Sequence, residues 1–181
     1  MALSKIQSES VNLADTFAFT GTVTGASNPV YITRFGHTSN LTSDGTLTNW
    51  AAPALSNQVA TINTAVTVSS GVFTFPVTGV WEIQMYGRVL GSGDTTVAIN
   101  QFVSTDGGST FPTNYANGVN GGDATTTGNV TFTDYINVDN TSNIKVKFAG
   151  SSIATGSYVF GAAVANGLRC WVNFKRITGA Q

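Results

Sequence analysis

The residues of this chain that could carry out catalysis are few and lie far apart in the sequence. Hydrolysis by a serine or cysteine nucleophile needs a histidine base that a carboxylate orients. The one histidine, His37, has no nucleophile-elbow motif beside it, so we expect it to be a loop or surface residue. The one cysteine, Cys170, cannot form an intrachain disulfide. Because Cys170 alternates with Val172 and Phe174, it is predicted to be a small core residue rather than a reactive thiol.

The carboxylates do not form the pairs or clusters that hydrolysis or metal binding requires. A glycosidase needs two carboxyl groups about 5–10 Å apart across a sugar, and no local pattern forces such a pair. Asp106-Gly-Gly-Ser109 and Asp139-Asn-Thr-Ser-Asn143 offer oxygens to calcium, but neither has EF-hand spacing, so both are expected to be plain turns. Most carboxylates stand beside Gly, Ser or Asn, the usual setting of turn aspartates. The nine are Glu9, Asp15, Asp44, Glu82, Asp94, Asp106, Asp123, Asp134 and Asp139.

Sequence motifs for other kinds of site are also missing. The sequence has no phosphate loop, dinucleotide fingerprint or zinc spacing. Its basic residues are scattered apart from Lys175-Arg176, and the net charge is −1, so no nucleic-acid partner is expected. We therefore expect no catalytic residue, no cofactor and no metal. Exposed aromatic residues could stack on sugars or anchor a protein interface, and the sequence leaves both uses open. The candidates are Trp50, Trp171, Tyr86, Tyr115 and Tyr135.

The segment Phe73-Thr-Phe-Pro-Val-Thr-Gly-Val-Trp-Glu-Ile-Gln-Met-Tyr-Gly87 predicts the elements around these residues. It is typical of a strand, a Pro/Gly corner and a second strand. After the corner, apolar residues alternate with polar ones, as in a strand with one buried face. The buried set is Trp81, Ile83 and Met85, and the outward set is Glu82, Gln84 and Tyr86.

Similar alternation recurs along the rest of the chain. Roughly seven or eight strands without helices predict an all-β antiparallel sandwich of the jelly-roll type over residues 26–181. Asn166-Gly167 predicts a hairpin, and Ser109–Gly128 is expected to be a long loop that is functional or ordered by a partner. The other predicted strands are Ala60–Val68, Phe73–Val77, Val97–Val103, Val130–Val138, Ile144–Phe148, Tyr158–Val164 and Leu168–Ile177.

The composition favours a protein that packs against other protein surfaces. The chain has 181 residues, of which 41% are hydrophobic, enough for one domain with a core. Only 9% are charged, against about 25% in average soluble proteins. A surface of hydroxyls and amides predicts contact with copies of itself or with other proteins. No signal-peptide h-region and no run of bilayer length are present, so we expect synthesis in a cytoplasm and no membrane partner.

Residues 1–25 differ from the rest because sparse apolar residues stand in a polar background without a common period. This pattern predicts an extended arm that docks on another surface. A first edge strand of the same domain is the equal alternative. The apolar residues expected to dock are Leu3, Ile6, Val11, Leu13, Phe17 and Phe19.

The run from Ile62 to Arg88 resembles the complement-component and tumour-necrosis-factor-like jelly roll. The resemblance is carried by an apolar alternation, then Gly71-Val-Phe-Thr-Phe-Pro-Val-Thr-Gly-Val-Trp81, then an alternating strand. Thr131-Phe-Thr-Asp-Tyr-Ile-Asn-Val-Asp-Asn140 with Ile144-Lys-Val-Lys-Phe148 fits the penultimate hairpin of that family. The resemblance implies a homotrimer with aromatic-rich contacts along a three-fold axis. The outward residues Glu82, Gln84 and Tyr86 are then the expected inter-subunit residues.

The opening Met1-Ala-Leu-Ser-Lys-Ile-Gln-Ser-Glu-Ser-Val-Asn-Leu-Ala-Asp15 is similar to that of small virion proteins of tailed bacteriophages. This resemblance implies a non-enzymatic structural protein of the virion, made in the host cytoplasm. Within that class we expect a trimeric capsid decoration or cement protein whose arm binds the major capsid protein or another virion protein. The alternative is a receptor- or glycan-binding domain of a tail fibre. It would bind a host-surface glycan through Ser109–Gly128 and exposed aromatic residues.

Overall fold

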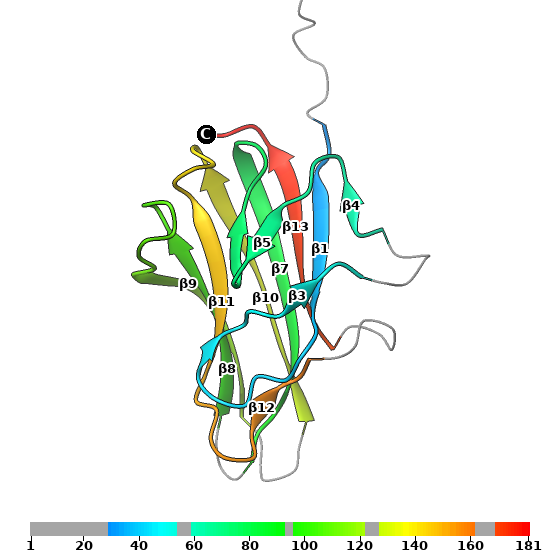
Figure 1. The fold of residues 1–181 in the computed structure, drawn as a ribbon, viewed down its shortest axis with the longest axis vertical. Coiled ribbons are helices and arrows are strands. Elements are labelled where there is room, and N and C mark those ends of the chain that lie inside the picture. The colour runs from blue at the N-terminus through cyan, green and yellow to red at the C-terminus, as the bar shows by residue number, and fades with distance from the viewer. Residues whose placement is uncertain (1–28, 54–58, 93–95, 122–126, 162–168) are drawn as a thin grey trace, which may run out of the picture.

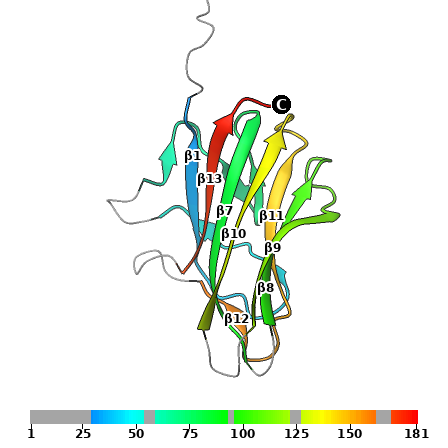
Figure 2. The same ribbon diagram turned by 180° about the vertical axis from the view of Figure 1, so that it is seen from behind.

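The computed structural model describes residues 29–53, 59–92, 96–121, 127–161 and 169–181. These residues form two antiparallel β-sheets packed face to face and contain no helix (Figures 1 and 2). The predicted all-β jelly roll is therefore confirmed. Among the described residues there is accordingly no helix long and apolar enough to cross a membrane.

Both sheets combine strands from distant parts of the chain. The first contains β1 (Ile32–His37), β3 (Trp50–Ala51), β4 (Thr61–Ile62), β7 (Gly79–Leu90), β10 (Thr127–Val138), β12 (Tyr158–Val159) and β13 (Cys170–Thr178). Its order is β10-β7-β13-β1-β3, with β12 beside β7 and β4 beside β1. The second contains β2 (Gly45–Thr46), β5 (Thr67–Ser69), β6 (Val72–Thr74), β8 (Thr96–Ser104), β9 (Thr113–Gly121) and β11 (Lys145–Ser151). Its order is β5-β6-β11-β8-β9, with β2 beside β11.

The Pro/Gly corner carries the chain from one sheet to the other, as the sequence predicts. Strand β6 ends at Thr74 in the second sheet, and β7 begins at Gly79 in the first. Gly79 is needed because β13 passes close to it. A Cβ at this position would lie 2.5 Å from the Thr178 carbonyl oxygen, and the φ of Gly79 is +151°.

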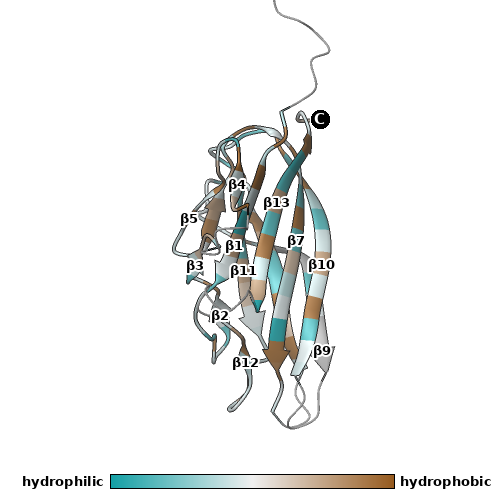
Figure 3. Cartoon of the chain, turned by 90° about the vertical axis from the view of Figure 1, so that its right-hand side faces the viewer, coloured by the Kyte–Doolittle hydropathy of each residue, from teal (hydrophilic) through white to brown (hydrophobic). Residues whose placement is uncertain are grey.

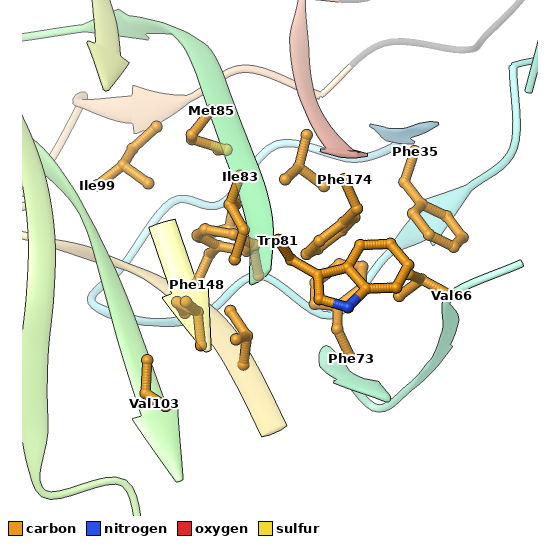
Figure 4. Packing of buried hydrophobic residues seen from close by; sticks show 14 of the residues in the cluster. Phe35, Val66, Phe73, Trp81, Ile83, Met85, Ile99, Val103, Phe148 and Phe174 are labelled. Carbon is orange, nitrogen blue, oxygen red and sulfur yellow. The ribbon is translucent and has the colours of Figure 1, made fainter. Parts of the chain in front are cut away.

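Aromatic side chains fill the core between the sheets (Figure 4). Trp81 and Ile83 are fully buried and Met85 is 2% exposed, so the predicted inward face of β7 is confirmed. The Phe73 ring lies 4.9 Å from that of Phe174 and 5.6 Å from that of Phe148, centroid to centroid. Such contacts across both sheets stabilise the sandwich beyond simple burial of area.

Two predicted elements, one a strand and the other a long loop, are wrong for the same reason. Ala60–Val68 is not one strand, because β4 pairs with β1 while β5 pairs with β6 in the other sheet. The chain changes sheet between them, with Asn63 at a φ of 61°. Ser109–Gly128 is not a long loop, because β9 pairs along β8 over most of its length. In both cases the pairing partner, rather than local composition, decides the structure.

The local composition of β9 does not suggest a strand, because this segment is rich in glycine and asparagine. Glycine and asparagine have low strand propensity, so Asn117, Gly118 and Asn120 suggest a loop. A Cβ on Gly118 would lie 2.4 Å from Val130 Cγ1, so this glycine lets β10 of the first sheet approach β9 closely. The two sheets thus meet along the β9–β10 edge.

Two other predictions concern residues outside the described ranges. Asn166-Gly167 is one of them, so the hairpin predicted there stays a prediction. The strands described on either side, β12 and β13, both pair with β7. The predicted arm, residues 1–25 with Leu3, Ile6, Val11, Leu13, Phe17 and Phe19, also lies outside. The strand β1 begins at the end of the sandwich where the C-terminus lies (Figure 1).

Candidate interaction face

The single histidine is part of the interior rather than of a loop or the surface. His37 ends β1 opposite Trp50 of β3 and is only 2% exposed. The two ring centroids lie 5.1 Å apart. Burial lowers the pKa of His37 to about 4, and Nδ1 has no hydrogen-bond partner among the described residues. The prediction of a surface histidine is wrong because the end of β1 is covered by β3, which sequence alone does not reveal.

Cys170 lies in the core as predicted, and the two segments that offer oxygens to calcium are turns held by their own hydrogen bonds. Cys170 is fully buried, and burial raises the pKa of its thiol. The Asp106 carboxylate accepts hydrogen bonds from Ser104 Oγ at 2.6 Å and Thr110 Oγ1 at 2.6 Å. These bonds hold the pKa of Asp106 well below its usual range. In the second turn, the Asn140 side chain accepts from the Ser142 amide. Across the described ranges no three His, Cys, Asp or Glu side chains gather as metal ligands would.

A polar bridge inside the sandwich joins the two sheets. Asp134, which interrupts the apolar face of β10, accepts a hydrogen bond of 2.6 Å from Gln101 Nε2 on β8. Gln101 is fully buried, and its Oε1 has no partner among the described residues. The interruption of alternation at Asp134 is the only sequence signal of this bridge.

The three predicted inter-subunit residues belong to the outer face of the first sheet, which we call the sheet face. It is formed by the outward side chains of β10, β7, β13 and β1, whose inward side chains form the core. Figure 3 shows the resulting bands of hydropathy along β13, β7 and β10. The outward residues are Asn129, Thr131, Thr133, Tyr135 and Asn137; Glu82, Gln84, Tyr86 and Arg88; Trp171, Asn173 and Lys175; and Ile32 and Arg34.

The three predicted inter-subunit residues lie together on the sheet face. Glu82, Gln84 and Tyr86 are half-buried at alternate positions of β7, between β10 and β13. The residues opposite Gln84 are Thr133 on β10 and Asn173 on β13. Uncharged amides and hydroxyls therefore occupy the middle of this surface.

An aromatic stack crosses the sheet face beside these amides. The rings of Tyr86 and Trp171 are stacked at 5.8 Å with an interplanar angle of 18°. The Arg34 guanidinium lies 4.4 Å from the centroid of the Trp171 ring. Tyr86 donates a hydrogen bond of 2.8 Å to Asn129 Oδ1. The Trp171 ring is thus held between a cation and a second ring, which fixes its orientation.

The remaining candidate aromatics have different surroundings. Trp50 packs on Phe73 and Phe148 of the core, and its Nε1 donates to the Leu47 carbonyl at 2.6 Å, so it is not a surface platform. The side chain of Tyr115 lies outside the described part of the molecule. Tyr135 is 60% exposed on β10 and donates a hydrogen bond of 3.1 Å to Glu82 Oε2. This bond and the negative charge of Glu82 raise the pKa of Tyr135.

A hollow of about 310 Å³ opens on the sheet face between the threonines of β10 and the aromatic stack. Thr131 lies opposite Tyr86, and Thr133 lies opposite Gln84. The difference in size between these side chains creates the hollow. Its lining residues are Gln84, Met85, Tyr86, Thr131, Phe132, Thr133 and Trp171.

Comparison with known proteins identifies the fold but no family. No protein-family model and no curated protein matches the chain. The crystal structure of murine APRIL at pH 5.0 matches with a TM-score of 0.59 and 8% identity, covering 82% of this chain and 99% of that one. A structure of Eiger TNF from S. frugiperda matches with a TM-score of 0.57 and 12% identity, covering 85% and 96%. At such identities the similarity shows the fold alone, and the tumour-necrosis-factor-like jelly roll predicted from the corner motif is confirmed.

Proposed function

We propose that this chain is a non-enzymatic structural protein that assembles as a homotrimer through the sheet face. The observation that carries this proposal is the make-up of that face. Its middle combines a fixed aromatic stack with neutral amides and hydroxyls over β7, β10 and β13, the longest strands of the first sheet, while the charged residues Glu82, Arg88 and Lys175 flank this middle. The centres of protein interfaces are depleted in charged residues and enriched in aromatic residues and arginine. The number of subunits comes from the resemblance to trimeric jelly rolls.

Such an assembly is favoured because removal of water from the middle of this surface costs little free energy. Burial of a neutral amide or hydroxyl that finds a partner costs far less than burial of a charge. Glu82 is the one carboxylate among the described outward residues of the sheet face, and the Tyr135 hydroxyl already bonds it. A second copy can therefore cover Gln84, Thr133 and Asn173 without leaving unpaired carboxylates beneath it.

We place this trimer on a bacteriophage particle as a capsid decoration or cement protein. The support for this part is the N-terminal resemblance to small phage virion proteins, together with the charge-poor composition. The arm, residues 1–25, would bind the major capsid protein or another virion protein. The described chain starts at the end of the sandwich where the C-terminus lies (Figure 1).

The stacked rings favour self-assembly over glycan binding by a tail-fibre domain. A sugar stacks on an open aromatic face, but the Arg34 guanidinium lies over the Trp171 ring and Tyr86 stacks with it. The segment that would have supplied a binding loop, Ser109–Gly128, instead contains the strand β9. The edges of the rings remain available, and edges suit contact with protein side chains.

A charged substitution on the sheet face tests the assembly. Thr133→Arg places a cation in the middle of the face, so we expect the trimer to dissociate to a folded monomer. The measurement is size-exclusion chromatography with light scattering at micromolar concentration, with circular dichroism to verify folding. Thr67→Arg on the exposed side of β5 in the other sheet is the matched control and should remain trimeric. A wild-type protein that is monomeric under these conditions would refute the proposal.

Removal of the arm tests the virion role separately. Deletion of residues 1–25 should leave a folded trimer that no longer binds particles, because the jelly roll does not contain the docking residues. Binding is measured by co-sedimentation with particles that lack the protein and by locating the protein on virions by electron microscopy. Full occupancy by the truncated protein would show that docking does not depend on the arm.

A further inference from the structure

We propose that Tyr135 of one copy inserts into the hollow on the sheet face of a second copy. This inference rests on the proposed self-association and specifies the side chains at its centre. It combines two features of one surface, namely an open hollow and a protruding side chain on the strand that borders it.

The hollow has the chemistry to receive an aromatic ring with a polar tip. The edges of Tyr86 and Trp171 form one wall, and they can pack against another ring. Gln84, Thr131 and Thr133 supply an amide and two hydroxyls, which can bond a phenolic oxygen. At about 310 Å³ the hollow is much larger than the share of a single water, which is about 30 Å³.

Tyr135 is the described side chain that suits this hollow best. Five large hydrophobic side chains are exposed in the described part of the chain, and Tyr135 is the one that carries a hydroxyl. The others are Val30, Val59, Ile62 and Ile177, whose aliphatic groups would leave Gln84 and the two threonines without partners. Tyr135 also projects from the strand that provides Thr131 and Thr133.

The charges around the two features are complementary. The Tyr135 hydroxyl is bonded to Glu82, so a copy that inserts Tyr135 brings this carboxylate with it. On the receiving copy, the Arg34 guanidinium lies over the ring of Trp171, which lines the hollow. Insertion therefore brings a carboxylate toward the part of the sheet face that carries this cation.

Cysteine cross-linking tests the contact directly. In one copy, residues 131 and 135 of β10 are about 13 Å apart at about 3.3 Å per residue. An inserted tyrosine also holds the two Cα atoms of the contact beyond the about 4.4–6.8 Å that a disulfide needs. The cysteines of the double variant Tyr135→Cys with Thr131→Cys are therefore joined by a short bis-maleimide, at a protein concentration well above the dissociation constant of the variant. We expect covalent dimers and trimers on a denaturing gel. Tyr135→Cys with Thr67→Cys is the matched control and should stay largely uncross-linked.

Truncation of the side chain gives an independent measurement. Tyr135→Ala should raise the dissociation constant of self-association by roughly tenfold or more, as expected for a central aromatic contact. Val59→Ala, a truncation at a similarly exposed position, should leave it unchanged. Filling the hollow with Thr131→Trp should weaken assembly as Tyr135→Ala does.

The outcomes separate this inference from the proposed function. If the wild-type protein is a trimer but the double cysteine variant cross-links no more than its control, the Tyr135 contact is wrong and the self-association stands. If the wild-type protein is a monomer, both fail. Cross-linking together with the loss of affinity in Tyr135→Ala supports both.

Discussion

At the scale of single residues, polar side chains in this protein are held by specific surroundings. The Asp106 carboxylate is occupied by the hydroxyls of its own turn, and Gln101 is fully buried against Asp134. The buried Nδ1 of His37, in contrast, has no hydrogen-bond partner among the described residues, as is also the case for Gln101 Oε1 and Arg34 Nε. A buried imidazole without a charged partner favours the neutral form, so this residue makes folding depend on pH.

We expect acid to destabilise the protein through His37. Its pKa is about 4 in the folded protein, below the ordinary value of 6.5, so the unfolded chain binds the proton first as pH falls. The stability is complete above pH 6.5 and is lost between about pH 6.5 and 4, by at most about 3 kcal/mol. Urea unfolding at pH 7.5 and 4.5 measures the difference. The variant His37→Phe keeps a ring against Trp50 and should lose this component. An equal drop in both proteins would assign the pH dependence to other groups.

At the scale of elements, the alternation of β7 could be predicted because it is a local property of the strand. Trp81, Ile83 and Met85 lie inward for the same geometric reason in any half-buried strand. The switch of sheet between β4 and β5, and the pairing of β9, could not be predicted because both depend on partners distant in sequence. The sheet face could be expected from Glu82, Gln84 and Tyr86. The hollow could not, because it arises where Thr131 faces Tyr86 from a distant part of the chain.

A prediction about stability concerns Gly79, which lies in the corner between β6 and β7. We expect Gly79→Ala to destabilise the fold by about 1–3 kcal/mol, since an added methyl group must displace backbone. The Thr178 carbonyl oxygen lies 2.5 Å from the position of the new Cβ, and a carbonyl in a paired strand cannot turn away. The control is Gly179→Ala, where nothing lies within 4 Å of the added atom. Thermal and urea unfolding should show a loss in the first variant alone.

At the scale of the whole molecule, the outer faces of the two sheets carry different side chains. The first carries the sheet face with its aromatic stack, hollow and projecting Tyr135. The outer side of the second carries lysines instead, with Lys147 lying 4.5 Å from the centroid of the Phe111 ring and 5.5 Å from that of Phe102. A cation so placed keeps that surface hydrated while covering the rings. This asymmetry agrees with a trimer that buries one sheet and exposes the other.

The hydrogen bond between Gln101 and Asp134 has a mechanical consequence for the sandwich. A single dispersion attraction between two apolar atoms is weak and only weakly directional, so no one such contact determines how two sheets are aligned. A directional bond between a buried amide and a carboxylate is satisfied at one alignment only, and displacement leaves both groups unpaired. The Gln101–Asp134 bond therefore resists shear between the sheets and favours one alignment of β8 with β10. Because Tyr135 follows Asp134 on β10, the same bond restrains the position of Tyr135.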